Sequence, residues 1–176
     1  MKRILAIAFL CGFALLADAP RISRLAMSQL EAQVDKLFAS DPRLMIEGNT
    51  RGVYLDGYGA VFTTMVSVPT KVPSPFNDFS KKDMLEVRDT KLKELPALRD
   101  KMRQSLLMMA ASPALDGVRP AEQVVCGVTL FYYKWENTAG LPREIMFQAE
   151  KQQLISVQSG RVPRNQLEAL LKVQEQ

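Results

Sequence analysis

Apolar residues recur at three- and four-residue spacing between residues 21 and 40, and this spacing predicts an amphipathic helix. The residue before a proline avoids helical geometry, so Asp41-Pro42 ends the helix. We expect its apolar side to pack on the core of a domain. A membrane-surface or coiled-coil helix that links the domain to an uncleaved anchor is the alternative. The apolar stripe consists of Ile22, Leu25, Ala26, Leu30, Val34, Leu37 and Phe38.

The next pattern predicts a β-hairpin over residues 51–68, where two runs of strand-forming residues flank Asp56-Gly57. Asp-Gly between such runs is a strong hairpin signal, because glycine adopts the positive φ that a tight turn needs. A two-residue loop sets Tyr54 opposite Gly59, which leaves space for the tyrosine ring. One face of this hairpin then carries Val53, Leu55, Tyr58, Ala60, Phe62, Thr64 and Val66, and the other carries Tyr54, Gly59, Val61, Thr63 and Met65.

A second helix is predicted over residues 80–111, where apolar residues again keep helical spacing. Ser80 and Asp83 stand three residues apart at its start, as in a capping box. Pro96 lies inside the pattern and predicts a kink, because proline lacks an amide hydrogen and clashes with the preceding turn. The charged residues on the other side of this helix indicate a face in contact with water.

A second hairpin is predicted over residues 122–149. The run 122–135 is apolar on both alternating faces, which places it centrally in a sheet, covered on both sides for part of its length. Residues 143–149 form the partner strand. Residues 150–176 are predicted as a C-terminal helical segment, although the pattern over 165–173 leaves open a short helix or an edge strand.

Together these elements predict an α+β fold with the order α-ββ-α-ββ-α, in which helices pack on a mainly antiparallel four-stranded sheet of two β-hairpins. A composition of 47% hydrophobic and 24% charged residues is that of a globular domain. Neither a change in composition nor an internal repeat marks a boundary, so residues 20–176 are predicted to form a single domain.

The first 19 residues are typical of a signal peptide. Two basic residues precede the apolar run 4–17, which is shorter than the roughly 20 residues of a comfortable membrane span. Ala17-Asp18-Ala19 offers a cleavage site; cleavage after Ala17, or an uncleaved anchor in the inner membrane, is the alternative. We therefore expect a periplasmic or secreted protein, which contacts the membrane only if this segment is retained.

The charge of the chain and the residue types that it lacks exclude several classes of function. Loss of residues 1–19 leaves a net charge of +3 with the two signs well mixed, whereas nucleic-acid binders concentrate basic residues, so we predict no nucleic-acid partner. The chain has no histidine, which removes Ser-His-Asp and Cys-His catalysis and histidine-ligated metal sites. After cleavage Cys126 is the single cysteine, and its apolar surroundings in the sequence predict a buried thiol outside any disulfide. No metal or cofactor motif is present, so neither is predicted.

Tyrosines, the tryptophan and carboxylates in turns remain as candidates for a ligand or partner surface. Rings on a sheet stack bases or sugars in some proteins, but few basic residues lie near these rings, so core packing and a cross-strand ladder are the simpler interpretation. Acids in turns are more commonly turn formers or solvated charges than catalysts. The surface residues that we select are Tyr54, Asp56, Tyr58, Tyr133, Trp135 and Glu136.

The stretch YLxGYGxxF that begins at Tyr54, the stretch LFYYKWENTAGLP that ends at Pro142, and the export signal together resemble uncharacterised exported bacterial proteins. The resemblance covers most of the chain after the signal and implies no activity. Because no catalytic motif is present, we expect a non-enzymatic binding or assembly domain that contacts a protein partner or associates with itself. The alternatives are a small histidine-free hydrolase that uses carboxylates and tyrosines, and a membrane-tethered accessory domain.

Overall fold

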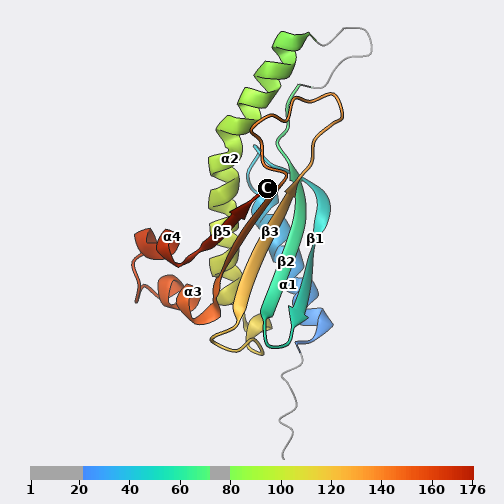
Figure 1. Cartoon of the computed structure of the whole chain (residues 1–176). Coiled ribbons are helices and arrows are strands. Elements are labelled where there is room, and N and C mark those ends of the chain that lie inside the picture. Colours follow the sequence, from blue (N-terminus) through green and yellow to red (C-terminus); the bar gives the residue numbers. More distant parts are fainter. Residues whose placement is uncertain (1–21, 72–79) are drawn as a thin grey trace, which may run out of the picture.

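Five strands form one sheet, and the two long helices α1 and α2 lie along one of its faces (Figure 1). The computed structural model describes residues 22–71 and 80–176, so the predicted signal peptide, residues 1–19, lies outside the described residues. The helices are α1 (Arg24–Ala39), α2 (Lys81–Ala110), α3 (Lys151–Gln158) and α4 (Leu167–Leu170), with short 3-10 turns at Pro113–Leu115 and Arg164–Gln166. The strands are β1 (Met45–Leu55), β2 (Gly59–Ser67), β3 (Gln123–Leu130), β4 (Glu144–Glu150) and β5 (Lys172–Glu175).

The strand order is β1-β2-β3-β4-β5, and every neighbouring pair is antiparallel except β2 and β3, which are parallel. The α+β prediction is confirmed. The prediction of four antiparallel strands matches only in part, because the sheet has five strands and one parallel pair. The cause of the parallel pair is α2, whose 30 residues carry the chain back along the sheet, so that β3 starts at the same end as β2.

The C-terminal region supplies the strand that the predicted order lacks. Residues 165–173 could be read as a helix or an edge strand, and the structure contains both, since α4 leads directly into β5 at the edge of the sheet. The predicted strand over 122–135 is shorter than expected, because β3 ends at Leu130 and the chain then enters a loop of thirteen residues, 131–143.

The β1–β2 hairpin turns through three residues, 56–58, so the predicted two-residue loop is wrong by one residue. Leu55 pairs with Gly59, and the amide of Tyr58 donates to the carbonyl of Leu55 over 3.0 Å. Gly57 has φ +78°, the value that the third residue of a type II turn adopts.

This change of register reassigns the faces of the hairpin. Side chains alternate along a strand, so a shift of one residue moves the whole of β1 to the other face relative to β2. Tyr54 therefore pairs with Ala60 on the covered face, and Val53 pairs with Val61 on the opposite face.

Gly59 is required by the backbone of β3 rather than by the ring of Tyr54. Its φ is +134°, and a Cβ atom at this position would lie 1.9 Å from the carbonyl oxygen of Gln123. The predicted role of Gly59 as a space for Tyr54 is therefore wrong, because Tyr54 pairs with Ala60 and the backbone of β3 lies against Gly59.

The core lies between the covered face of the sheet and the two long helices. α1 begins after Ser23, whose hydroxyl accepts a hydrogen bond from the amide of Ala26 over 3.1 Å. Leu25 was expected in the apolar stripe but is 70% exposed, since it lies about 200° around the helix from the buried Met27. The residues that α1 buries are Met27, Leu30, Glu31, Val34 and Phe38.

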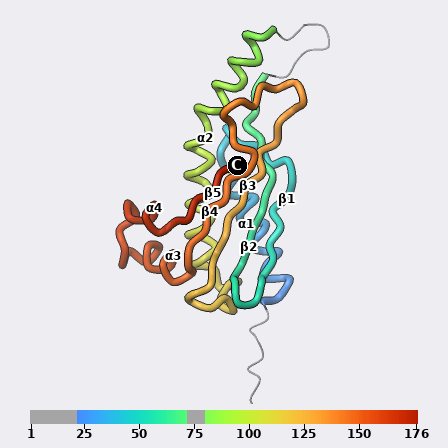
Figure 2. The backbone as a smooth tube through the Cα atoms, viewed as in Figure 1, coloured from blue at the N-terminus to red at the C-terminus, as the bar shows by residue number. Residues whose placement is uncertain are grey.

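The long helix α2 starts with the predicted capping box, in which the Ser80 hydroxyl and the Asp83 carboxylate each accept the other residue's amide. The helix continues through Pro96, and its axis bends between the N-terminal and C-terminal halves (Figure 2). After the proline, Leu98, Met102 and Leu106 are completely buried between the helix and the sheet.

α1 also closes the free edge of β1. The carboxylates of Glu31 and Asp35, about one turn apart, accept the amides of Gly52 over 2.8 Å and Thr50 over 2.9 Å. Burial alone would raise the pKa of Glu31, but hydrogen bonds from Arg24 and from the amide of Gly52 outweigh burial and lower it. Glu31 is therefore an ionised acceptor that occupies an amide to which another strand could otherwise bind.

In the part of the chain that the structure describes, no helix combines the length and the apolar composition that crossing a bilayer requires.

Candidate functional site

The selected surface residues separate into two groups at opposite ends of β3. The turn at residues 56–58 lies beside Gln123, where β3 begins, and the segment 133–136 follows Leu130, where β3 ends (Figure 2). Eight residues of strand span about 25 Å. The two groups therefore do not form one concave site.

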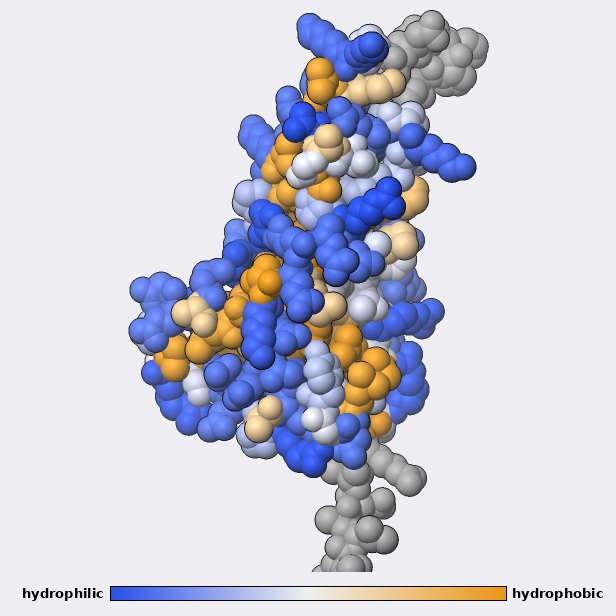
Figure 3. Space-filling model, viewed as in Figure 1, coloured by the Kyte–Doolittle hydropathy of each residue, from blue (hydrophilic) through white to orange (hydrophobic). Residues whose placement is uncertain are grey.

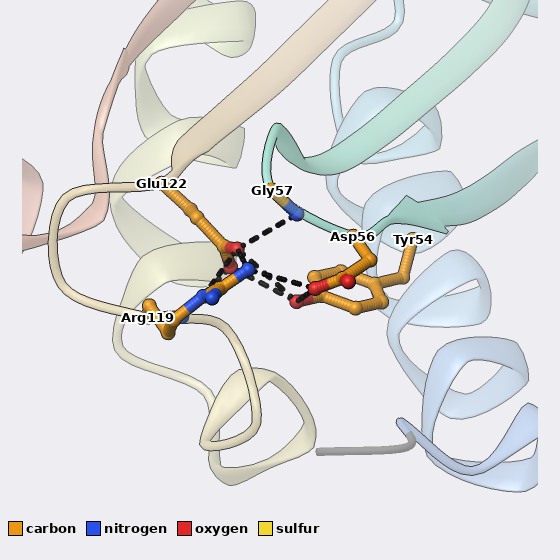
Figure 4. Close-up of polar contacts among 5 residues, drawn as sticks. All are labelled: Tyr54, Asp56, Gly57, Arg119 and Glu122. Atoms are coloured by element: carbon orange, nitrogen blue, oxygen red, sulfur yellow. Dashed lines mark hydrogen bonds and ion pairs between the residues drawn. The ribbon is translucent and has the colours of Figure 1, made fainter. Parts of the chain in front are cut away.

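At the first end, four groups converge on the carboxylate of Glu122 (Figure 4). The hydroxyl of Tyr54 lies 3.1 Å from Oε2, and the amide of Gly57 lies 3.2 Å from Oε1. Arg119 donates its own amide over 2.9 Å and its Nε over 2.7 Å. The same guanidinium reaches Asp56 Oδ1 over 2.7 Å. This cluster ties the β1–β2 turn to the loop that enters β3.

The electrostatics of this cluster favour a structural role. Burial of Glu122 would raise its pKa, but hydrogen bonds from Arg119 and Tyr54 outweigh burial and lower it. Burial and the hydrogen bond to Glu122 raise the pKa of Tyr54. An ionised acid and a neutral phenol that bind each other are poorly placed to act as a general acid and a general base near neutral pH.

Tyr58 reaches across β3 from the same turn. Its hydroxyl donates to Oε1 of Gln148 on β4 over 3.2 Å, so the side chain must pass over β3 on the face that α1 and α2 do not cover. Val125, the neighbour of Gln148 on β3, is only 1% exposed although it points to this face. Tyr58 therefore supplies the second-side covering of β3 that the sequence predicts.

At the second end, three rings form a row along the loop that follows β3. Phe131 and Tyr133 meet edge to face with ring centroids 5.1 Å apart. Tyr133 and Trp135 stack with centroids 5.8 Å apart and an angle of 11° between the ring planes. The row is a set of mutual contacts in a loop rather than the cross-strand ladder that the sequence suggested.

A buried ion pair holds this loop to α2. Lys91 donates to Glu136 over 2.6 Å, and the side chains are 3% and 1% exposed. Lys91 also lies 5.0 Å from the ring centroid of Tyr132. Burial, together with the charge of Glu136, raises the pKa of Tyr132 to about 12. Glu136 is thus an internal residue, and an exposed surface at this end would have to consist of other residues.

A further exposed surface lies on the face of the sheet opposite α1 and α2, which we call the open face. No helix among residues 22–71 and 80–176 lies over it (Figure 1). Apolar residues gather over the β1–β2 half of the open face near the turn (Figure 3). The exposed apolar side chains on this face are Met45, Val53, Leu55, Tyr58 and Met65.

Two shallow hollows adjoin at Thr63 and Thr129 on the open face, and the one towards β5 lies over Gly127. The absence of a side chain at this glycine leaves space there. Met146 lines this hollow, and Met65 lines the other. Polar and charged residues, among them Arg51, Glu144 and Gln174, line the hollows together with the two methionines. Shallow hollows of mixed lining suit contact with side chains of a partner better than enclosure of a small molecule.

The carboxylates of Asp56, Glu122 and Glu136 are engaged in separate ion pairs, and no three potential metal ligands come together in the described residues.

Comparison of the chain with family models, with curated proteins and with solved structures gives no match. The function of the chain has to be inferred from its own side chains and their geometry.

Sequence reasoning missed both the open face and Glu122. The open face was hidden by the one-residue error in the hairpin, which set Val53 and Leu55 on the side of Phe62. The alternation of Val125, Gly127 and Thr129 was visible in the sequence, but only the position of α2 decides which side of β3 is covered. Glu122 carried little signal, because only its contact with Arg119 is local, and its other partners Gly57 and Tyr54 lie 65 and 68 positions away.

Proposed function

We propose that this chain is an exported, non-enzymatic binding or assembly domain whose contact surface is the open face of its sheet. The observation that carries the proposal is the difference in burial between the two faces of the sheet. One face is buried under α1 and α2, whereas the other exposes Val53, Leu55 and Met65. Exposed apolar side chains grouped on one face are characteristic of interaction surfaces.

The state of the acidic residues also favours binding over hydrolysis. Asp56 and Glu122 bind Arg119 at one end of the sheet, and Glu136 binds Lys91 at the other. A glycosidase-type mechanism needs two carboxyl groups within about 10 Å of each other in one cleft, with one of them held protonated. The lowered pKa of Glu122 is opposite to that requirement.

Site-specific photo-crosslinking in cells that produce the full chain tests this proposal. A photoreactive residue at Val53 lies on the open face, and the same residue at Gln104, an exposed position of α2, is the matched control. We expect crosslinked protein from position 53 and none from position 104. No crosslink from position 53, combined with a monomer in light scattering, contradicts the proposal.

Export is tested separately by mass spectrometry of the chain recovered from cells. A periplasmic or secreted product that begins at Pro20 or Asp18 supports cleavage and export. A product that remains in the membrane fraction and keeps residue 1 favours the tethered alternative.

A further inference from the structure

We infer that the open face is covered by a second copy of this chain, so that two sheets pack face to face about a two-fold axis. The inference rests on the proposed function, because it names the partner of the same face. It follows from how apolar groups, charges and the hollows are distributed over the five strands.

Apolar and polar groups divide the open face into two halves. The β1–β2 half carries exposed apolar residues together with a charged arginine, whereas the β4–β5 half is mostly polar with one methionine. The residues are Leu55, Val53, Met65 and Arg51 in the first half and Glu144, Gln148, Lys172, Gln174 and Met146 in the second. A two-fold axis along the strands would set β1 against β5 and bury apolar groups against polar ones. An axis across the strands turns the second sheet end for end. The β1–β2 halves of the two copies then face each other, and so do the two β4–β5 halves.

The register of the sheet shows which side chains then meet. Arg51, Thr63, Gly127 and Met146 form one row across the strands, and we place the axis over this row. Side chains on one face recur every second residue, and we call this interval along a strand one step. Val61 lies one step to one side of the row and Met65 one step to the other, so Val61 of one copy faces Met65 of the other.

Leu55 and Met45 lie two steps away from the same row in opposite directions along β1, so these two exposed residues also face each other across the axis. The hollow over Gly127 lies on the axis row beside Met146. The space above this glycine lets the two sheets approach to the usual separation of about 10 Å without a clash at the centre.

The charges on β4 and β5 fit the same arrangement, whereas Arg51, in the axis row, faces Arg51 of the other copy at the β1 edge and lowers the affinity there. Glu144 and Lys172 form no ion pair with any described residue of their own chain, and they lie on opposite sides of the axis row on β4 and β5. When the second sheet is turned end for end, Glu144 of one copy and Lys172 of the other lie at the same height along the strands. They are offset sideways by one strand spacing, about 4.8 Å. Two such pairs form at the polar rim.

The size of the face is sufficient for a dimer. Five strands at about 4.8 Å and eight residues at about 3.3 Å give a patch of roughly 600 Å² on each copy. The total of about 1,200 Å² reaches the lower end of the range of stable protein interfaces. A moderate affinity is therefore expected, with a monomer–dimer equilibrium at micromolar concentrations.

Sedimentation of the purified chain over a range of concentrations is the first test. We expect a monomer–dimer equilibrium, in which Met65→Lys weakens the dimer about tenfold or more by burying a charge. Leu85→Lys, at a similarly exposed apolar position on α2, is the control and leaves the dimer unchanged. Circular dichroism of both variants shows whether the fold is retained.

A charge exchange tests the geometry independently. Glu144→Lys and Lys172→Glu each set like charges opposite one another and weaken the dimer, and the double variant recovers the affinity of the original chain to within about threefold. Because the two residues are two steps apart along the sheet within one chain, the recovery depends on contact between copies.

A cysteine trap fixes the position of the axis. Met146 lies in the axis row, so a bismaleimide that spans about 10 Å links Met146→Cys of one copy to the same residue of the other, whereas Gln104→Cys on α2 is not linked. Equal trapping at the two positions overturns the inference.

The outcomes separate this inference from the proposed function. If the chain sediments as a monomer while the crosslinker at position 53 captures another protein, the second copy is ruled out and the binding function stands. A strict monomer without any crosslink at position 53 removes both. A dimer that Leu85→Lys disrupts and Met65→Lys does not is a dimer through another surface, and it also overturns the inference.

Discussion

Two glycines at the β1–β2 turn have different structural roles although only one residue separates them. Gly57 provides a positive φ in open space, whereas Gly59 provides both a positive φ and room for the backbone of β3. We predict that Gly59→Ala lowers the free energy of unfolding by about 2–5 kcal/mol, because strain and a backbone clash add together. Urea unfolding measures the loss.

The matched control for this prediction is Gly57→Ala, where a Cβ atom meets nothing within 4 Å. Only the cost of a left-handed backbone remains there, about 1–2 kcal/mol. Equal losses for the two variants would show that the approach of Gln123 to Gly59 is not what constrains this residue.

At the scale of single residues, the sequence predicted local chemistry better than distant contacts. The positive φ of Gly57 and the capping box of Ser80 and Asp83 depend on neighbours in the sequence, and both are present. The contact of Gly59 with Gln123 depends on a strand that starts 64 residues later. No local pattern contains that information.

At the scale of elements, the loop after β3 is held to α2 by a buried charge pair. Lys91→Met removes one partner and leaves Glu136 as an uncompensated buried charge, so we predict a loss of about 3–5 kcal/mol in the free energy of unfolding. The double variant Lys91→Met with Glu136→Leu removes both charges and recovers most of that loss.

Urea unfolding of the two single variants and the double variant measures this coupling as a double-mutant cycle. One carboxylate oxygen of Glu136 has no hydrogen-bond partner among the described atoms, which increases the benefit of removing both charges. If the losses of the single variants simply add in the double variant, the pair does not act as a unit.

The contact between α1 and β1 is a second feature at this scale, and it leads to a prediction about association. Glu31→Ala frees the amide of Gly52 on the edge of β1, and we expect faster aggregation with a rise in thioflavin fluorescence. Glu86→Ala, which removes an exposed glutamate of α2, is the control. Equal aggregation rates for the two variants would contradict a protective role of Glu31.

Helical periodicity predicted the helices closely, because α1 and α2 each bury one stripe and their ends carry recognisable signals. The strands were harder to define. Phe131 to Trp135 continue the apolar composition of β3 but leave the sheet, because the rings pack on one another and the loop is held by α2. β5 has only four residues, and all are exposed, so the sequence contains no alternating apolar pattern that predicts this strand.

For the whole molecule, the α+β class could be derived from the sequence, but the parallel pair could not. Hairpins and helices follow from local patterns, whereas the pairing of β2 with β3 depends on where α2 returns the chain. The candidate surface depended on the same step, since only the packing of α1 and α2 decides which side of the sheet stays open.

The response of the whole molecule to acid follows from its ionised carboxylates. The hydrogen bond from Arg43 lowers the pKa of Asp41 from 3.8 to about 2, and the pKa values of Glu31 and Glu122 are also lowered. Acids with lowered pKa values bind fewer protons in the folded state than in the unfolded state. We therefore predict that these acids leave stability unchanged between about pH 5 and pH 8, and that stability falls as the pH decreases from about 4.5 towards 2.

Urea unfolding at several pH values measures this decrease, and Asp41→Asn provides the comparison, because it removes the contribution of the group with the lowest pKa. The variant should lose less stability between pH 4 and pH 2 than the original chain. An equally steep decrease in the variant would show that Asp41 does not contribute to the acid response.

The burial of Cys126 gives the protein an internal reporter of its own opening. The thiol is 1% exposed at the centre of the sheet, and burial raises its pKa to about 12, so it reacts only when β3 separates from the helices. With Cys11 replaced by serine, we predict alkylation slower by a factor of at least about 10³ than in the urea-unfolded chain. The alkylation rate then follows the fraction of molecules in which the sheet is open. Rapid alkylation of the folded protein would mean that the centre of the sheet opens far more easily than its burial implies.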